Sequence, residues 1–125
     1  MQWKRIRGIT CGLLIVMMCV LAMGAKGCYG GAHCHRLMHL WNAAGGASVE
    51  PAYLMAAIAM AESGGDANTV GADGELGYWQ IDPHYWAASA EPHENAREAV
   101  QVARKMGLNA WTTYKNGAFH GFCGA

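Results

Sequence analysis

A long uncharged segment is the feature of this sequence that most limits its fold. Across residues 51–61 nothing is charged, and nearly every residue favours a helix. Apolar residues fall on every face of such a helix, so we expect it to be buried rather than amphipathic. Glu62 comes at its end, and Gly64 and Gly65 follow. These glycines should end the helix, because glycine readily takes the left-handed conformation after a last helical turn. The sequence therefore predicts a central buried helix with one carboxylate at its C-terminal end.

The position of Glu62 is unfavourable for a charged carboxylate. Apolar surroundings remove hydration from the anion, and the negative end of the helix dipole repels it, so both effects should raise its pKa. A carboxyl group that keeps its proton near neutral pH is what a glycosidase uses to protonate a leaving oxygen. The alternative is a solvated glutamate on an exposed last turn, and Glu62 alone does not decide between them.

The N-terminal residues have the pattern of an export signal. Three basic residues precede an uncharged apolar run over residues 9–23, which is short for a membrane span, and small residues follow. We expect residues 1–27 to be a signal peptide, with an uncleaved N-terminal anchor as the alternative. Residues 28–125 then form one small domain, which should be secreted or lie in the cell envelope.

Removal of the signal changes the charge of the protein. The full chain has nine basic and nine acidic residues, whereas residues 28–125 keep five basic and all nine acidic ones, a net charge of −4. Nucleic acid is therefore an unfavourable partner. We expect a monomer that meets the membrane only through the signal segment or a lipid anchor at Cys28, although Lys26 fits a lipoprotein signal poorly.

Three cysteines lie beyond the signal, at Cys28, Cys34 and Cys123. In an exported protein this number indicates one disulfide and one remaining thiol. We favour a disulfide between Cys34 and Cys123, which would join the first helix to the end of the chain. The histidines around Cys34 lack a nearby carboxylate or second cysteine pair, so we expect no metal site.

The rest of the chain predicts a mainly helical domain. Residues 33–44 and 94–106 have helical periodicity and each is followed by glycine, and a short last helix is expected near residues 111–115. Residues 66–75 are rich in Gly, Asn and Asp, which indicates a loop. No strand pattern of any length occurs.

Some helix ends and faces can also be predicted by residue. Ser48 is expected to cap the central helix, with Glu50 in its first turn, and Asn109 to cap the last helix. Met106 is expected on the buried side of the helix over residues 94–106.

A candidate sugar-binding surface lies just after the predicted loop. The rings of Tyr78 and Trp79 can stack on pyranose faces, and the amide of Gln80 can hydrogen-bond hydroxyl or acetamido groups. The alternative is that both rings belong to the core.

Taken together, these segments resemble the catalytic core of the lytic transglycosylases of the soluble, goose-lysozyme-like group. The matching blocks are Glu62-Ser63 after a buried helix, residues 77–81 and residues 113–117. The resemblance covers about residues 48–119 and is closest to the short actinobacterial and phage variant. Tyr78 stands where the family usually has leucine, and Lys115 stands where it usually has asparagine. The resemblance implies a small lysozyme-like helical fold with little or no β-sheet.

The resemblance also implies a reaction. Members of this transglycosylase group cleave the β-1,4 bond between N-acetylmuramic acid and N-acetylglucosamine in peptidoglycan. By this resemblance, Glu62 would act first as general acid and then as general base. The acetamido group or 6-hydroxyl of the substrate replaces a protein nucleophile and gives a 1,6-anhydro product, so no cofactor is expected. The implied substrate-contacting residues are Ser63, Tyr78, Gln80, Ile81 and Tyr114.

Two other functions stay open at this point. A hydrolytic lysozyme would need a second carboxylate, roughly 5–5.5 Å away for retention or 6.5–9.5 Å for inversion. A non-catalytic glycan-binding module is the other, because many wall-active proteins are basic and this domain is acidic. The candidates for the second carboxylate are Asp66, Asp73, Glu75 and Asp82.

Overall fold

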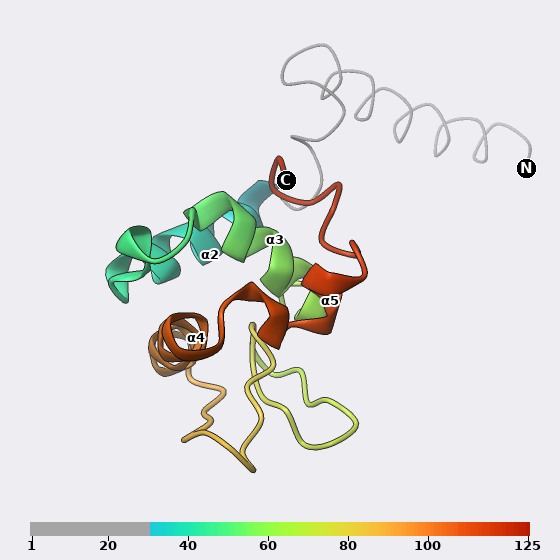
Figure 1. Cartoon of the computed structure of the whole chain (residues 1–125). Helices are drawn as coiled ribbons and strands as arrows, with labels where there is room; N and C mark the ends of the chain where they lie inside the picture. The colour runs from blue at the N-terminus through green and yellow to red at the C-terminus, as the bar shows by residue number, and fades with distance from the viewer. Residues whose placement is uncertain (1–30) are drawn as a thin grey trace, which may run out of the picture.

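Helices form most of the regular structure in this protein. The computed structural model describes residues 31–125, so the predicted signal peptide (residues 1–27) and Cys28 lie outside the described residues. The elements in Figure 1 are α2 (Gly31–Ala43), α3 (Ala52–Ser63), α4 (Pro92–Met106) and α5 (Thr112–Lys115), with 3₁₀ turns at Gly46–Ser48 and Leu108–Ala110. Within this part of the chain, β-structure is limited to the isolated bridges Val70–Leu76 and Leu76–Ile81. The predicted helical fold class is confirmed.

Helix α3 is the central element, as its uncharged sequence predicts. Residues 55–60 are all buried, so the helix is enclosed around its circumference over this stretch. It ends at Gly64, which has a φ of 65° and donates its N–H to the carbonyl of Met60 at 2.8 Å. A residue with a side chain is disfavoured in that conformation, so glycine fixes the point at which the helix stops.

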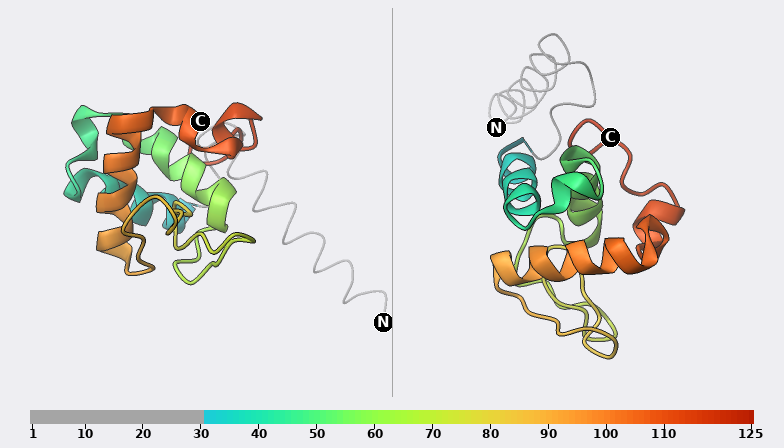
Figure 2. Two further views of the ribbon diagram at one scale, coloured as in Figure 1. Left: turned by 60° about the horizontal axis from the view of Figure 1, so that its bottom comes forward. Right: turned by 60° about the vertical axis from the view of Figure 1, so that its left-hand side comes forward.

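The other helices enclose α3. Helix α2 packs beside α3, and the right-hand view of Figure 2 shows α4 crossing below this pair, next to the long loop of residues 66–90. Helix α2 contributes Leu37, Leu40 and Trp41 to the core, and α4 contributes its alanines and valines. Small side chains on α4 allow its backbone to lie close to α2.

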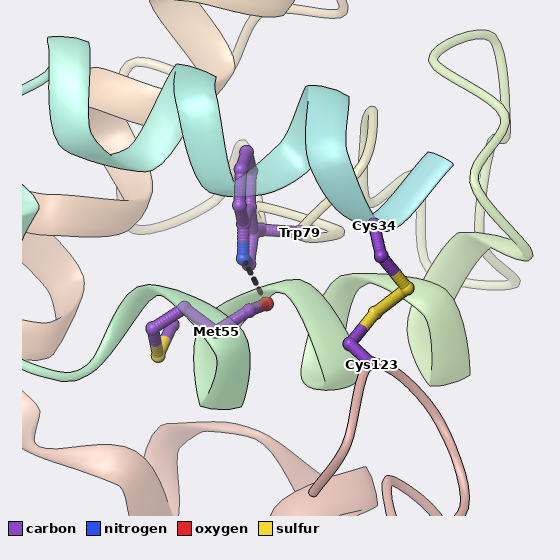
Figure 3. Close-up of a disulfide and its surroundings, with 4 residues drawn as sticks. All are labelled: Cys34, Met55, Trp79 and Cys123. Atoms are coloured by element: carbon purple, nitrogen blue, oxygen red, sulfur yellow. Dashed lines mark hydrogen bonds between the residues drawn. A yellow bond between two sulfur atoms is a disulfide. The ribbon is translucent and has the colours of Figure 1, made fainter. Parts of the chain in front are cut away.

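Three buried tryptophans join these layers through their indole N–H groups. Trp41 donates to the carbonyl of Glu50, Trp79 to that of Met55 and Trp111 to that of Trp79, each at 2.9 Å. Figure 3 shows the Trp79 indole directed at the Met55 carbonyl of α3. A buried indole would lose a hydrogen bond without such a partner, so each ring is fixed in orientation as well as in position.

The C-terminal segment is attached covalently to α2. Cys34 and Cys123 form a disulfide across 89 residues of sequence, in the pairing favoured from the sequence (Figure 3). The disulfide holds the tail that follows α5 close to the N-terminal half of α2.

Several predicted details of the helices are wrong. Ser48 lies in a 3₁₀ turn and Glu50 precedes the helix, so α3 begins at Ala52 without a side-chain cap. Asn109 lies in the second 3₁₀ turn, and Trp111 takes the position before α5. In both cases a short turn inserted before the helix moves its start beyond the polar residue.

Helix α4 starts earlier than predicted, and the residue in its last turn is not buried as expected. It begins at Pro92, because the carboxylate of Glu91 accepts hydrogen bonds from the backbone N–H groups of His93 and Glu94. These bonds satisfy two N–H groups that a helix end leaves unpaired. Met106 was expected on the buried side but is 62% exposed, since it lies in the last turn beyond the core.

Asn95 anchors the long loop to α4. Its side chain is fully buried (0% exposed), where its Oδ1 accepts the N–H of Trp79 at 3.0 Å. Its Nδ2 donates to the carbonyls of Leu76 and Ser89, each at 2.8 Å. One amide thus ties both arms of a loop without helix or strand to the helical core, which is why Asn95 is a structural residue.

Candidate active site

A cleft of about 780 Å³ opens at the C-terminal end of α3. It lies where residues 71–86 of the long loop face the end of α4 and the segment that leads into α5. Of the described residues that line it, three are carboxylates and none is cationic; the carboxylates are Glu62, Glu75 and Asp82. Apolar walls with a few polar groups are typical of a site for a small molecule or sugar chain.

Glu62 is the carboxylate that the helical core positions most firmly. It lies in the last turn of α3, is partly buried, and its Oε1 accepts a hydrogen bond from the hydroxyl of Thr113 at 2.8 Å. Burial raises its pKa above the ordinary value and the negative charge of Glu75 adds to this, while hydrogen bonds from Thr113 act in the opposite direction. Glu62 therefore combines a tendency to hold its proton with a fixed orientation toward the cleft.

Thr113 is a site residue that sequence reasoning missed. It belongs to α5, 51 residues from Glu62 along the chain, so no local pattern connects the two. The third resemblance block begins at Thr113, and this position in the block is the sequence signal that could have identified it.

Gln80 lies on the loop wall of the cleft in a strained conformation. Its φ is +49°, which is uncommon for a residue with a side chain. Its Nε2 donates to the carbonyls of Thr69 and Gly77, each at 2.9 Å, and Thr69 in turn donates its hydroxyl to the carbonyl of Ser63 at the end of α3. The amide nitrogen is thus used to hold the loop, and Oε1 remains as the acceptor of this side chain. Strain of this kind is commonly found at functional sites.

Gly71 leaves room for the polar atoms of this wall. A Cβ atom at this position would lie 2.2 Å from Oε2 of Glu75 and 2.7 Å from Oε1 of Gln80. Such distances are below any real contact, so only glycine allows both oxygens to occupy their present positions. The closely approaching backbone at Gly71 therefore shapes this part of the cleft.

The predicted aromatic surface divides between the core and the cleft. Ile81 lines the floor of the cleft although it is almost completely buried. Tyr78 is only 3% exposed and Trp79 is fully buried, so neither ring faces a sugar. The prediction that Tyr78 contacts substrate is corrected, because the two rings pack edge to face in the core with centroids 6.1 Å apart.

Ser63 and Tyr114 also differ from their predicted roles. The hydroxyl of Ser63 donates to the carbonyl of Ala59 at 2.9 Å and accepts the N–H of Gly65, so it completes the end of α3, and Ser63 does not line the cleft. Tyr114 stacks on Phe119 and lines a second, shallower pocket. Tyr114 does not line the cleft, because the residue one position earlier on α5, Thr113, lies on the side of this helix that faces Glu62.

The candidate second carboxylates also divide into two groups. Glu75 and Asp82 line the cleft with Glu62, whereas Asp66 and Asp73 do not. Oε2 of Glu75 accepts the N–H of Asp73 at 3.0 Å. Asp82 accepts the N–H of His84 and pairs with its Nδ1 at 2.7 Å. Both cleft carboxylates are therefore engaged within their own loop.

A comparison with models of known families identifies the family of this domain. A family model described as a lysozyme-like domain matches residues 38–113, more than half of the chain. The chain belongs to the lysozyme-like domain family. The matched residues include Glu62, Gln80 and Thr113, whereas Tyr114 falls just outside them.

Membership in the lysozyme-like domain family gives the kind of activity. It implies an enzyme that cleaves glycan, with peptidoglycan as the class of substrate. The fold described above, helices with almost no β-structure in residues 31–125, agrees with a small lysozyme-like domain. Neither the curated proteins nor the solved structures contain a significant match to the chain.

The described part of this lysozyme-like domain has neither a candidate metal-binding group nor a candidate membrane-spanning helix. Residues 31–125 contain no group of three or more His, Cys, Asp or Glu side chains arranged to hold a metal ion. No helix among these residues has the length and apolar character needed to cross a membrane.

Proposed function

We propose that this domain is a peptidoglycan lytic transglycosylase that uses Glu62 as both acid and base. The observation that carries the proposal is the state of Glu62: partly buried at a helix end, with a raised pKa, in a cleft of suitable size for a glycan. A general acid must be protonated when the leaving oxygen departs, and burial favours the protonated form.

The proposed reaction has two proton transfers. Glu62 protonates the glycosidic oxygen as the bond to C1 of N-acetylmuramic acid breaks, and becomes a carboxylate. The 6-hydroxyl of the same sugar then attacks C1 and gives its proton to Glu62, which regenerates the acid and leaves a 1,6-anhydro end. No water is consumed. Residues of the segment 62–113 position the sugar, and Glu62 transfers the protons, so the proposal needs no cofactor.

Thr113 and Gln80 support this reaction in different ways. The Thr113 hydroxyl holds Oε1 of Glu62 and so orients the carboxyl group for proton transfer to a glycosidic oxygen. The Oε1 atom of Gln80 is an acceptor suited to a sugar hydroxyl or to the N–H of an acetamido group. An acetamido N–H bound in this way would help to fix the reacting sugar.

A hydrolytic lysozyme is the second candidate, favoured by one observation. Glu75 lines the same cleft and its charge contributes to the raised pKa of Glu62, so a second carboxylate faces the same space. It could activate a water molecule for attack on C1.

Product analysis separates the two candidates. Purified peptidoglycan sacculi are digested with the wild-type protein, and the soluble fragments are examined by mass spectrometry. We expect 1,6-anhydro-muramyl ends, which are lighter by one water molecule than reducing ends. Reducing ends alone would support the lysozyme, and no release of fragments would support a module that binds glycan without cleaving it.

The place of action follows from the substrate. Peptidoglycan lies outside the cytoplasmic membrane, so we propose that residues 1–27 direct export and that the domain acts in the envelope or the medium as a monomer. The cleft lining gives no support to a nucleic acid partner, because the described residues bring three carboxylates and no cation to it.

A further inference from the structure

Exposed apolar side chains gather at one part of the cleft. In residues 31–125 the large hydrophobic side chains that stay exposed are Tyr53, Val70, Tyr85 and Met106. Two of these, Tyr85 (81% exposed) and Met106 (62%), line the cleft, and the partly exposed Trp86 lines it with them. Exposed apolar side chains that cluster in a cleft indicate contact with a ligand. Single exposed apolar residues elsewhere on a surface carry no such indication.

A lysine borders this apolar part. The Nζ atom of Lys105, in the last turn of α4, lies 5.5 Å from the ring centroid of Trp86. A cation over an indole fixes the orientation of the ring and holds the ammonium at the edge of the cleft. Lys105 and Trp86 come from α4 and the long loop, so the pair also connects the two sides of the cleft.

The charge at this place contrasts with the rest of the cleft. Glu62 and Glu75 make the catalytic part acidic. Of the other cations in the described chain, Arg97 is paired with Glu94 on the outer face of α4. Asp82 is the carboxylate nearest to Trp86 along the chain, and its side chain is already bound to His84. Lys105 lies over the Trp86 ring and so offers a positive group to an anionic ligand at this side.

We propose that Trp86 and Lys105 form a subsite for a peptide-bearing sugar of the glycan strand. The sugar lies against the apolar surface of Trp86, Tyr85 and Met106, and the ammonium of Lys105 binds a carboxylate of the stem peptide. The inference rests on the proposed function, since it assumes that a peptidoglycan strand occupies the cleft. It adds that the enzyme distinguishes peptide-substituted glycan from neutral glycan.

The test measures binding rather than turnover. The full chain carrying Glu62→Gln is titrated calorimetrically, at low ionic strength, with a neutral oligomer of N-acetylglucosamine. It is then titrated with a peptide-bearing peptidoglycan oligomer of the same length. Each titration is repeated with Lys105→Gln, Trp86→Ala and Arg104→Gln added separately. Arg104→Gln is the matched control, because Arg104 precedes Lys105 on α4 and is equally exposed, whereas the cation over the Trp86 ring is Lys105.

The expected result differs between the two ligands. Lys105→Gln should weaken binding of the peptide-bearing oligomer by about fivefold, the size of an exposed charge pair, and leave the neutral oligomer unchanged. Trp86→Ala should weaken both ligands by about tenfold, since it removes the apolar surface. Arg104→Gln should change neither Kd by more than about twofold. Trp86→Phe serves as a second variant where Trp86→Ala lowers the melting temperature.

Four results would overturn the proposal. Equal weakening of both ligands by Lys105→Gln would mean that the lysine only supports the Trp86 ring. Equal effects of Lys105→Gln and Arg104→Gln would mean a general charge effect. Binding of neither oligomer to the Glu62→Gln protein would reject the proposed function together with this subsite, whereas binding of both without any effect of Lys105 or Trp86 would reject the subsite alone.

Discussion

The two walls of the cleft are built by different physical means. Glu62 stands on the helical wall, where α3 packs against α2 and α5 and its residues 55–60 are buried. The facing wall, over residues 71–86, has no helix and only isolated bridges, and side chains such as Asn95 and Gln80 hold it through hydrogen bonds to its backbone. Apolar burial fixes Glu62, and a polar network shapes the opposite wall of the cleft.

This difference indicates a division of labour. A general acid must stay within a few tenths of an ångström of its working position, which a packed helix end provides. A glycan-contacting surface needs exposed polar atoms and a particular shape, which loops provide more readily. Catalysis should therefore depend on the helical wall and recognition on the loop wall.

The largest expected effect belongs to the acid itself. Glu62→Gln should lower kcat on peptidoglycan by about 10²–10⁴-fold, because the amide cannot donate a proton as an acid does. Glu75→Gln, on the loop wall, should lower it by less than about tenfold if the substrate supplies its own nucleophile. Release of soluble fragments from sacculi measures both rates. Equal losses in the two variants would contradict the assignment of catalysis to the helical wall.

The stability of the same variant provides a control with a definite sign. Burial raises the pKa of Glu62 in the folded state, so the folded protein holds this proton more tightly than the unfolded chain. The resulting stability is present at low pH and is lost as the pH rises through the folded-state pKa. Glu62→Gln removes this dependence and should be at least as stable as the wild type at neutral pH, as thermal unfolding at several pH values would show. A lower melting temperature at neutral pH would mean that the activity loss includes unfolding.

The disulfide tests the helical side without touching the cleft. The double variant Cys34→Ala/Cys123→Ala opens a cross-link that spans 89 residues. The loop-entropy model gives a loss of about 4 kcal/mol in the free energy of unfolding. Chemical denaturation measures the change, and Cys28→Ala alone, expected to be the spare thiol, is the matched control. A double variant as stable as the control would mean that packing of the C-terminal tail suffices.

The helical wall could be predicted from the sequence, and the loop wall could not. An uncharged run followed by Glu62 and glycine predicts a buried helix with a carboxylate at its end, because burial and helix termination are local properties. Gln80 could be placed near the site only through the resemblance, since its orientation depends on carbonyls of Thr69 and Gly77. The partnership of Thr113 with Glu62 joins residues 51 positions apart, and no periodicity encodes it.

The same reason explains the errors at Tyr78 and Ser63. Both residue types suit sugar binding and core or cap positions equally well, so their identity does not decide where the side chain points. Tyr78 is buried because the loop turns back on α4 at Asn95, and that turn is a tertiary contact. Met106 shows the opposite error: an apolar residue in the correct helical register extends past the end of the core.

Asn95 provides the corresponding test of the loop wall. Asn95→Ala leaves the N–H of Trp79 and the carbonyls of Leu76 and Ser89 without their partner in the interior. We expect a loss of about 3 kcal/mol in the free energy of unfolding, since unsatisfied buried groups are expensive. Denaturant titration measures it, and the exposed neighbour substitution Arg97→Gln is the control. A loss below about 1 kcal/mol would mean that the network contributes little to this wall.

The smallest expected effect lies where the two kinds of contact meet, at Thr113. Thr113→Val keeps the shape of the side chain but removes the hydroxyl that bonds Glu62 at 2.8 Å. This bond lowers the pKa of Glu62 against the larger effect of burial, so its loss should raise that pKa further. The acid then stays protonated to higher pH, and the alkaline limb of the kcat/KM profile should move upward.

The same substitution also loosens the orientation of the acid. At the pH optimum kcat should fall by about threefold to tenfold, the value of one hydrogen bond, while KM changes little. Thr113→Ser retains the hydroxyl and should reproduce the wild-type profile. An alkaline limb that stays in place while kcat falls would mean that Thr113 positions Glu62 without tuning its proton affinity. A limb that moves to lower pH would contradict the assigned role of the bond, since removing it would then favour the ionised form.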